Sequence, residues 1–493
     1  MFENIGALYE LKDKSVFSKL NLIDAPFNAH NSYPEYPFPC KLSNYNPIYA
    51  SVRELFKILK LDINNYSKKN WNPLGKLISP GNSVVIKPNL VRHYHGSSED
   101  LGSVLTNGAI IRAVLDYVYI ALKGEGKVVI GDAPLQSADF EQIKNITGLN
   151  QVKLFYEQNS NLPVEVMDFR KECIIKDSEN SPIKEKRYLA GDTAGYVTVE
   201  LGDVSEHNNF DSAQFRKFRV TQYDKNKMLL HHNDKNHKYV ISKSALNADV
   251  FINLPKLKTH RKAGLTASLK NLVGINGSKD CIPHHRFGSM QNRCDEYLYS
   301  SFRKRIISYL WDMENNSNGI KRTLTSCLSR YFTYTNRFIK FKDPYFEGSW
   351  WGNNTIAYSV LDFNKIIKYV DCEGNLNDNP QRKYFTLIDA IVAGESEGPL
   401  SPRPRNCGIL IAGSNPLVTD LICCSVMGFD YRKIPTLSCG LGIKKYPLFG
   451  FSIDEIVVLT NIYGQVKFSD LTNKYNFHFT APNGWQGHIE SLK

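Results

Sequence analysis

The stretch that decides the fold is residues 250–260, which read VFINLPKLKTH. An apolar, β-rich run ends at a proline and is followed by two lysines, a threonine and a histidine. Small residues occupy 263–268, and a glycine-containing run, KNLVG, occupies 270–274. This pattern predicts a buried strand whose end presents an anion-binding loop. We expect the lysines of these runs to converge on one site.

Two further strand ends lie upstream. Residues 83–90 read SVVIKPNL and predict a short buried strand with Lys87 and Asn89 at its tip. A helical pattern over 110–122 leads to a second strand and a GDAP turn within 127–134. A strand, a helix and a strand form the βαβ unit of a parallel sheet, in which ligands bind at the carboxyl ends of the strands. We therefore expect all three strand ends to face one crevice.

Several motifs resemble a widespread prokaryotic family known as domain of unknown function 362. They are residues 87–90, 131–134, 254–260 and 270–274, followed by 387–399, 412–416 and Asp420. The resemblance extends from about residue 79 to about 440, and it implies an α/β fold without a settled reaction.

A shorter segment is similar to another family. His260, Ala263-Gly264, Lys270 and then His284 or His285 resemble the part of the nickel-dependent lactate racemases that holds an organometallic cofactor. This similarity covers a few dozen residues and has fewer glycines in the turn. It indicates a shared way of building a site rather than nickel binding.

The order of elements predicts an α/β protein of two lobes, each built on a parallel or mixed sheet with flanking helices. We expect an N-terminal extension over 1–78 and a first lobe over 79–285, with an irregular insertion near 150–245. A basic helical insertion is predicted over 286–345. The second lobe and a C-terminal tail are predicted over 346–493.

Charged and polar side chains near the strand ends define the predicted site. A histidine between a threonine and an arginine is suited to acid or base chemistry near neutral pH. Two tryptophans between glycines, in residues 347–355, suit stacking against a sugar or another planar ligand. The predicted catalytic residues are His260, Asp132 and Lys270. The predicted substrate-binding residues are Lys87, Asn89, Lys258, Thr259, Asn271, Trp351 and Asn353.

Two carboxylates in the C-terminal half are candidates for a metal site. Asp389 lies inside the apolar run 385–392, and Glu395 follows this run on what we expect to be a flexible turn. A buried carboxylate needs a lysine, a backbone cap or a metal as a partner. The lysines of the strand ends are the natural partners. Asp389 and Glu395 are also the predicted metal ligands, with a divalent cation as the candidate cofactor.

Cysteine and histidine spacing limits other cofactors. The ten cysteines include no pair with the two-residue spacing that iron–sulfur and zinc sites use, so no intrinsic iron–sulfur cluster is expected. Scattered cysteines without a signal peptide predict free thiols in a reducing cytosol. His231, His232 and His237 have no acid or thiol at a fixed spacing, and we expect them at the surface.

Composition sets the expectations for partners and location. The chain has 493 residues, 42% of them hydrophobic, and a formal charge of +12, which predicts an acidic partner. No apolar run approaches 20 residues, so no transmembrane segment is expected. Residues 303–332 combine basic residues with an apolar and aromatic face, which fits contact with a membrane surface or, more commonly, a helix packed on the core. No nucleic-acid-binding module is recognisable.

These features predict a cytoplasmic enzyme, with peripheral contact to the inner face of the membrane as one expectation. Its substrate would be anionic, phosphorylated or carboxylated, and phosphoryl or glycosyl-phosphate transfer is the favoured reaction class. Some longer members of the resembled family accompany cell-surface polysaccharide genes, which implies a saccharide as one candidate substrate. Two alternatives stay open. One is an enzyme with a redox or organometallic cofactor, and the other is a non-enzymatic protein that binds an anionic polymer or membrane.

Overall fold

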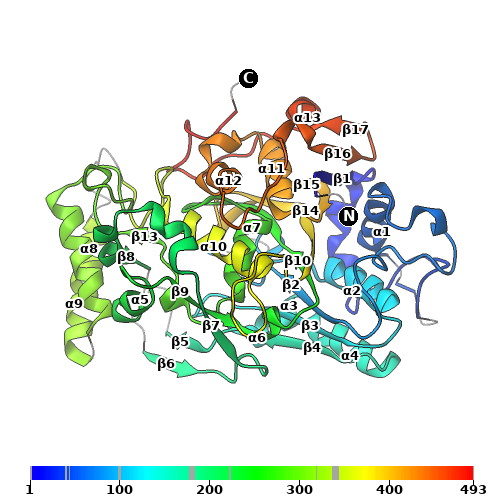
Figure 1. The fold of residues 1–493 in the computed structure, drawn as a ribbon, viewed down its shortest axis with the longest axis horizontal. Coiled ribbons are helices and arrows are strands. Elements are labelled where there is room, and N and C mark those ends of the chain that lie inside the picture. The colour runs from blue at the N-terminus through cyan, green and yellow to red at the C-terminus, as the bar shows by residue number, and fades with distance from the viewer. Residues whose placement is uncertain are drawn as a thin grey trace.

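A computed structural model describes residues 3–38, 42–43, 45–97, 101–176, 184–220, 224–317, 319–335 and 344–491. Within this part of the chain, an 11-stranded mixed sheet forms the centre of the molecule (Figure 1). In spatial order its main path is β17 (Gly464–Lys467), β16 (Val457–Thr460), β1 (Ile5–Glu10), β15 (Ser401–Gly413), β14 (Lys383–Glu397), β10 (Val250–Leu254), β2 (Ser83–Pro88), β3 (Lys127–Asp132) and β4 (Val164–Asp168). Two more strands, β11 (Lys256–His260) and β12 (Gly264–Thr266), extend it.

Five neighbouring strands of the sheet are parallel. Strand β10 pairs in parallel with β14 and β2, and β3 pairs in parallel with β2 and β4. Strand β15 runs antiparallel to β14 and β1. The carboxyl ends of β2, β3 and β10 therefore meet at one edge of the sheet, as the sequence predicted.

Hydrophobic side chains leave the central strands on both faces. In β2, Val84 and Ile86 belong to one core cluster and Val85 to the other. A strand covered on both faces is expected to be almost continuously apolar, which explains the run at 83–90. Helices cover both faces (Figure 1). They are α1 (Pro47–Ile58), α2 (Gly108–Leu122) and α4 (Leu149–Asn159) on one face, and α7 (Ser268–Asn271), α10 (Thr355–Tyr369) and α11 (Pro416–Met427) on the other.

The predicted α/β fold class, with a mixed sheet and flanking helices, is confirmed. Strand β1 places part of the predicted N-terminal extension inside the sheet, between β15 and β16. Strands from both 79–285 and 346–493 join the same sheet. The division of the chain into two lobes at these bounds stays a prediction. None of the helices in the described ranges has the length and apolar character needed to cross a bilayer.

Shorter elements decorate this core. The remaining strands form the pairs β5 (Glu172–Ile175) with β6 (Glu185–Tyr188), β7 (Tyr196–Glu200) with β9 (Lys238–Ser242), and β8 (Phe218–Arg219) with β13 (His285–Arg286). The remaining α-helices are α3 (Phe140–Ile146), α5 (Lys225–His231), α6 (Lys243–Leu246), α8 (Phe302–Asn315), α9 (Gly319–Thr335), α12 (Pro435–Leu441) and α13 (Leu471–Lys474). Helices α8 and α9 lie within the predicted helical insertion at 286–345.

Three local expectations are corrected. Residues 256–260 form β11 rather than a loop, because they pair with both β14 and β12. Glu395 lies within β14 rather than on a turn, because the hairpin with β15 stays paired as far as Glu397. His232 and His237 are buried rather than at the surface, where their rings contact each other and His207. Nine cysteines of the described residues are free thiols, and Cys40 lies outside these residues.

Candidate functional site

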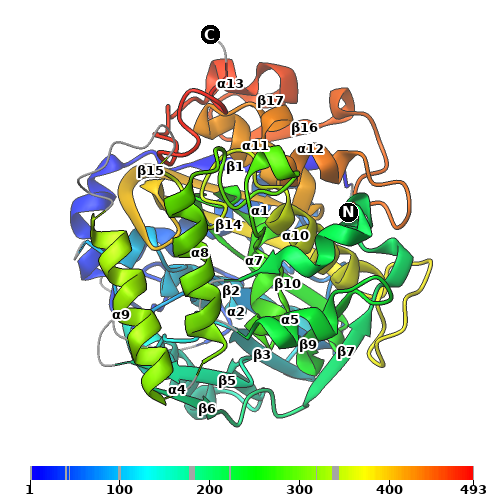
Figure 2. The ribbon, with the colours of Figure 1, turned by 90° about the vertical axis from the view of Figure 1, so that its left-hand side faces the viewer.

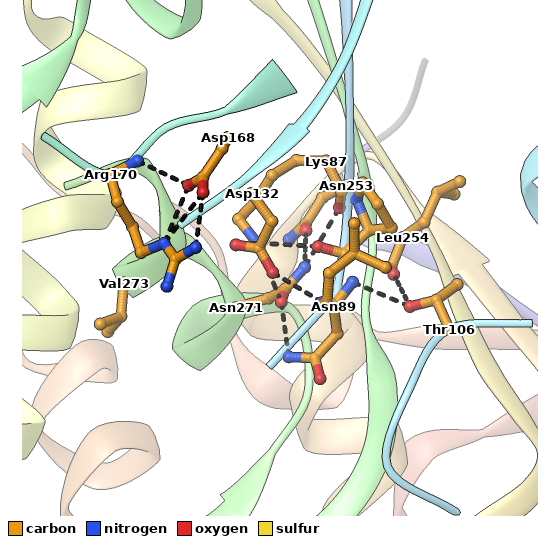
Figure 3. A network of polar contacts seen from close by, with 12 residues as sticks. Lys87, Asn89, Thr106, Asp132, Asp168, Arg170, Asn253, Leu254, Asn271 and Val273 are labelled. Atoms are coloured by element: carbon orange, nitrogen blue, oxygen red, sulfur yellow. Dashed lines mark hydrogen bonds and ion pairs between the residues drawn. The ribbon is translucent and has the colours of Figure 1, made fainter. Parts of the chain in front are cut away.

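An ion pair joins the ends of β2 and β3 at the carboxyl edge of the sheet (Figure 3). Lys87 Nζ lies 2.7 Å from Asp132 Oδ1, and the backbone N–H of Leu90 donates to Asp132 Oδ2 at 2.6 Å. Burial lowers the pKa of Lys87, and the adjacent Asp132 opposes that shift. Both side chains are buried, so this pair satisfies charges inside the protein.

Asparagine side chains connect this ion pair to β10 and α7 (Figure 3). Lys87 Nζ donates to Asn271 Oδ1 at 3.2 Å, and Asn89 Nδ2 donates to the same oxygen at 2.9 Å. Asn271 Nδ2 donates in turn to Asn253 Oδ1 at 2.7 Å. The network therefore fixes the position of α7, which also carries Lys270, the residue before Asn271.

The two lysines of β11 are also held inside the protein. Lys258 Nζ donates to Asn89 Oδ1 at 2.9 Å and to the carbonyl of Val104 at 2.7 Å. Burial and then the charge of Lys256 lower the pKa of Lys258 well below its usual value. Lys256 Nζ lies 2.6 Å from Asp389 Oδ2. Neither lysine is exposed, and direct substrate binding by Lys258 stays a prediction.

Lys270 differs from these lysines. Its side chain is partly exposed, and the described part of the chain offers its ammonium neither a hydrogen-bond acceptor nor a carboxylate within 4 Å. Burial, and next the charges of Lys262 and Lys87, lower the pKa of Lys270 to about 8. Lys279 is a second such amine, because burial lowers its pKa to about 7, although it donates to the carbonyl of Val273 at 3.2 Å.

Two histidines near these amines have opposite tautomers. His260 Nδ1 accepts from the backbone N–H groups of Lys262 at 3.0 Å and Ala263 at 3.2 Å, so the proton of the neutral ring is on Nε2. His284 Nδ1 lies 2.8 Å from the carbonyl of Ile282 and must donate to it, which leaves the Nε2 lone pair unprotonated. Burial, followed by nearby lysines, lowers the pKa of both rings well below the usual value. His260 is therefore a neutral donor and His284 a neutral acceptor.

The other predicted binding residues are engaged within the protein. Thr259 Oγ1 donates to the carbonyl of Ser396 at 2.8 Å. Asn353 Nδ2 donates to the carbonyl of His284 at 3.0 Å, which positions that histidine. The ring of Trp351 stacks on His488 with a centroid separation of 4.7 Å. Their predicted contacts with a substrate stay predictions.

The predicted metal ligands both have protein partners. Besides Lys256, Asp389 accepts from the backbone N–H groups of Asn107 at 2.9 Å and Ile391 at 3.2 Å. Glu395 Oε2 accepts from the backbone N–H of Thr480 at 2.9 Å, and Glu395 Oε1 lies 3.5 Å from Arg403. No group of three or more His, Cys, Asp or Glu side chains among the described residues is arranged to hold a metal ion. The residues present thus do not fit the predicted divalent cation.

Sequence reasoning did not assign Lys279 to the site and considered His284 only through the racemase similarity. Most lysines are exposed to solvent, and no local sequence pattern marks Lys279 as a residue of the site. Its signal is tertiary, because Asp132 and Lys270 both influence its pKa. Arg170 was also missed. It pairs with Asp168 (Figure 3) and donates to the carbonyls of Leu135 and Ala138, which fixes the loop after β3.

The fold and site define an α/β protein with an amine-rich site at the carboxyl edge of a mixed sheet. The model of the family described as "Domain of unknown function (DUF362)" matches residues 183–425, which confirms the predicted resemblance for that segment. The motifs at 87–90 and 131–134 precede the matched segment. Their residues Lys87, Asn89 and Asp132 nevertheless belong to the polar network around Asn271.

The individual proteins similar to the chain include a relative from Synechocystis and a solved structure. A "Thylakoid-associated protein sll1697" from Synechocystis sp. is 27% identical over 366 residues, which are 74% of this chain and 69% of that protein. Among solved structures, the lactate racemase apoprotein from Thermoanaerobacterium thermosaccharolyticum is 14% identical with a TM-score of 0.31. The similarity covers 86% of this chain and 58% of the racemase chain, and at that TM-score it supports no inference about the site.

Proposed function

We propose that the protein is an enzyme acting on an anionic substrate, phosphorylated or carboxylated, which binds beside Lys270 and Lys279. The observation that carries this proposal is the ammonium of Lys270. It stands without a carboxylate partner in the described structure, next to a polar network in which Asp132 is already paired with Lys87 and Asp389 with Lys256.

The charge balance of the site supports an anion. Asp132 is paired with Lys87, and Asp389 is paired with Lys256. No carboxylate within ion-pair distance remains for Lys270 or Lys279 in the described residues. A bound phosphate or carboxylate would supply the missing negative charge and would raise the pKa of both amines.

The neighbouring histidines supply complementary proton chemistry. With its proton on Nε2, His260 can donate a hydrogen bond to an oxygen of the substrate, and the free Nε2 of His284 can accept a hydrogen bond from a substrate hydroxyl or acid. Amines with a pKa near neutrality exchange protons readily at physiological pH, and such groups cluster at functional sites. This set favours acid–base chemistry on a substrate whose anionic group is held by lysines.

Replacing Lys270 by methionine is expected to abolish turnover, because the substitution removes the unpaired cation. The measurement incubates wild-type protein and Lys270→Met with a mixture of phosphorylated and carboxylated metabolites and follows depletion by mass spectrometry. Lys445→Met, at an exposed lysine, is the matched control and is expected to retain turnover. Depletion of a metabolite by wild type and Lys270→Met at equal rates would contradict the proposal.

Binding of sulfate, which stays fully ionised, is expected to weaken as the pH rises. The ammonium form of Lys270 binds the anion, so the contribution of Lys270 to the affinity is complete well below its pKa of about 8, and the affinity falls by about tenfold per pH unit above it. Lys279, with a pKa of about 7, starts the decline earlier. Isothermal titration calorimetry with sulfate from below the pKa of Lys279 to above the pKa of Lys270 checks the slope. A pH-independent affinity, or one unchanged in Lys270→Met, would argue against an anion at these amines.

A cytoplasmic location with peripheral membrane contact is part of the proposal. The Synechocystis relative is named a thylakoid-associated protein, which supports the proposed membrane contact. We propose no saccharide site at Trp351, because His488 covers one face of its ring. A role in polysaccharide biosynthesis thus has no support from this residue.

A further inference from the structure

Helix α9 has its apolar face toward solvent. Its large hydrophobic side chains are exposed, among them Ile320 at 82% and Leu324 at 60%. The exposed set is Ile320, Leu324, Leu328, Tyr331 and Tyr334. These positions are spaced by three or four residues and therefore form one stripe along the helix.

The opposite face of α9 is polar and buried. Thr325, Ser326 and Ser329 are buried, and Ser329 Oγ donates to Glu314 Oε2 of α8 at 3.1 Å. Figures 1 and 2 show α8 and α9 side by side at the periphery of the molecule. A helix that packs its polar face inward and exposes an apolar stripe leaves that stripe for another surface to cover.

The charge of α9 identifies the covering surface. The sequence of residues 319–335 contains Lys321, Arg322 and Arg330 and no aspartate or glutamate. Lys321 and Arg330 are exposed, one on each side of the stripe. On α8, Arg305 is exposed, as are the aromatic side chains of Phe302 and Tyr309. Apolar and tyrosine side chains flanked by basic residues are typical of helices that lie in the interface of anionic membranes.

A second copy of the chain is a poorer match for this surface. Two such stripes packed together would bring the basic residues of both helices into proximity, with no acidic residue on either helix to pair with them. Like charges at an interface oppose association. An anionic lipid surface instead offers phosphates to Lys321 and Arg330, the exposed basic residues that flank the stripe.

We propose that α9 docks the protein on an anionic lipid bilayer, with its apolar stripe inserted among the headgroups and Lys321 and Arg330 on lipid phosphates. This inference deepens the proposed peripheral location and is independent of the chemistry at Lys270. None of the described helices crosses the bilayer in this arrangement, and α8 packs against the buried face of α9.

The test is cosedimentation of the full chain with vesicles of equal parts phosphatidylglycerol and phosphatidylcholine. Wild type is expected to bind these vesicles, and to bind pure phosphatidylcholine at least about tenfold more weakly. Ile320→Ser with Leu324→Ser is expected to reduce binding by about tenfold or more, because apolar area is lost from the interface. Leu230→Ser, at a leucine 71% exposed on α5, is the matched control and is expected to bind as wild type does.

Other results would overturn the inference. Failure of wild type to bind the anionic vesicles overturns both the docking helix and the peripheral location. Equal binding by wild type and the double variant leaves the location standing and removes α9 from it. Absence of vesicle binding together with a dimer that the double variant abolishes, measured by analytical ultracentrifugation, would assign the stripe to self-association. Thermal unfolding of each variant confirms that the variant is folded. The turnover measurement with Lys270→Met tests the chemistry of the site separately from membrane docking.

Discussion

Replacing Lys256 by methionine is expected to lower the free energy of unfolding by about 3–5 kcal/mol. The ammonium of Lys256 and the carboxylate of Asp389 are 2.6 Å apart, and their residues are 1% and 0% exposed. Methionine preserves most of the side-chain volume but leaves the carboxylate buried without its cation. The backbone N–H groups of Asn107 and Ile391 that remain on Asp389 compensate only part of that loss.

Urea unfolding of three proteins isolates the ion pair. Wild type, Lys256→Met and the double variant Lys256→Met with Asp389→Leu are compared under the same conditions. The double variant is expected to recover much of the lost stability, because replacing both partners of a buried pair by apolar residues is often close to neutral. If Lys256→Met lowers the free energy of unfolding by less than about 1 kcal/mol, the ion pair does not contribute substantially to stability.

Substituting alanine for Gly274 is expected to destabilise the protein by about 3 kcal/mol or more. A Cβ atom at this glycine would lie 1.8 Å from Asp132 Oδ1 and 2.7 Å from Lys87 Nζ. Both side chains are buried, so they have no solvent-filled space into which to move. The substitution must either separate the ion pair or displace the backbone, whose carbonyl at Gly274 accepts from the N–H of Ala133.

Thermal unfolding provides the comparison for this substitution. Gly450→Ala is the control, because a Cβ atom there would have no neighbour within 4 Å. It is expected to leave the unfolding temperature nearly unchanged, while Gly274→Ala lowers it by several degrees and also weakens sulfate binding. Equal unfolding temperatures for the two variants would mean that the site tolerates a methyl group and that the pair is not tightly enclosed.

The sequence by itself determined the class of fold and the strands that carry the site. The apolar runs at 84–88, 128–130 and 250–254 lie in strands whose residues are buried on both faces of the sheet, and a strand buried in this way has a nearly continuous apolar sequence. The order of strand, helix and strand predicted the parallel arrangement, and with it the meeting of three strand ends at one edge.

Only the tertiary structure decided which lysines are available. In sequence, Lys256, Lys258 and Lys270 are equivalent candidates near one strand end. In the structure, Asp389 pairs with the first and Asn89 accepts from the second, while Lys270 has neither kind of partner among the described residues. Asp389 is 133 residues from Lys256, and Asn89 is 169 residues from Lys258.

Tertiary contacts, rather than local sequence, also decide the orientation of α9 and the tautomers of the two histidines. The sequence shows that α9 is amphipathic, but only its contact with α8 decides that the polar side is inside. The backbone groups that approach each ring fix the tautomers of His260 and His284. Local sequence determines the periodicity of burial, whereas the partner of a charged or polar group is determined by which distant segments the fold brings into contact.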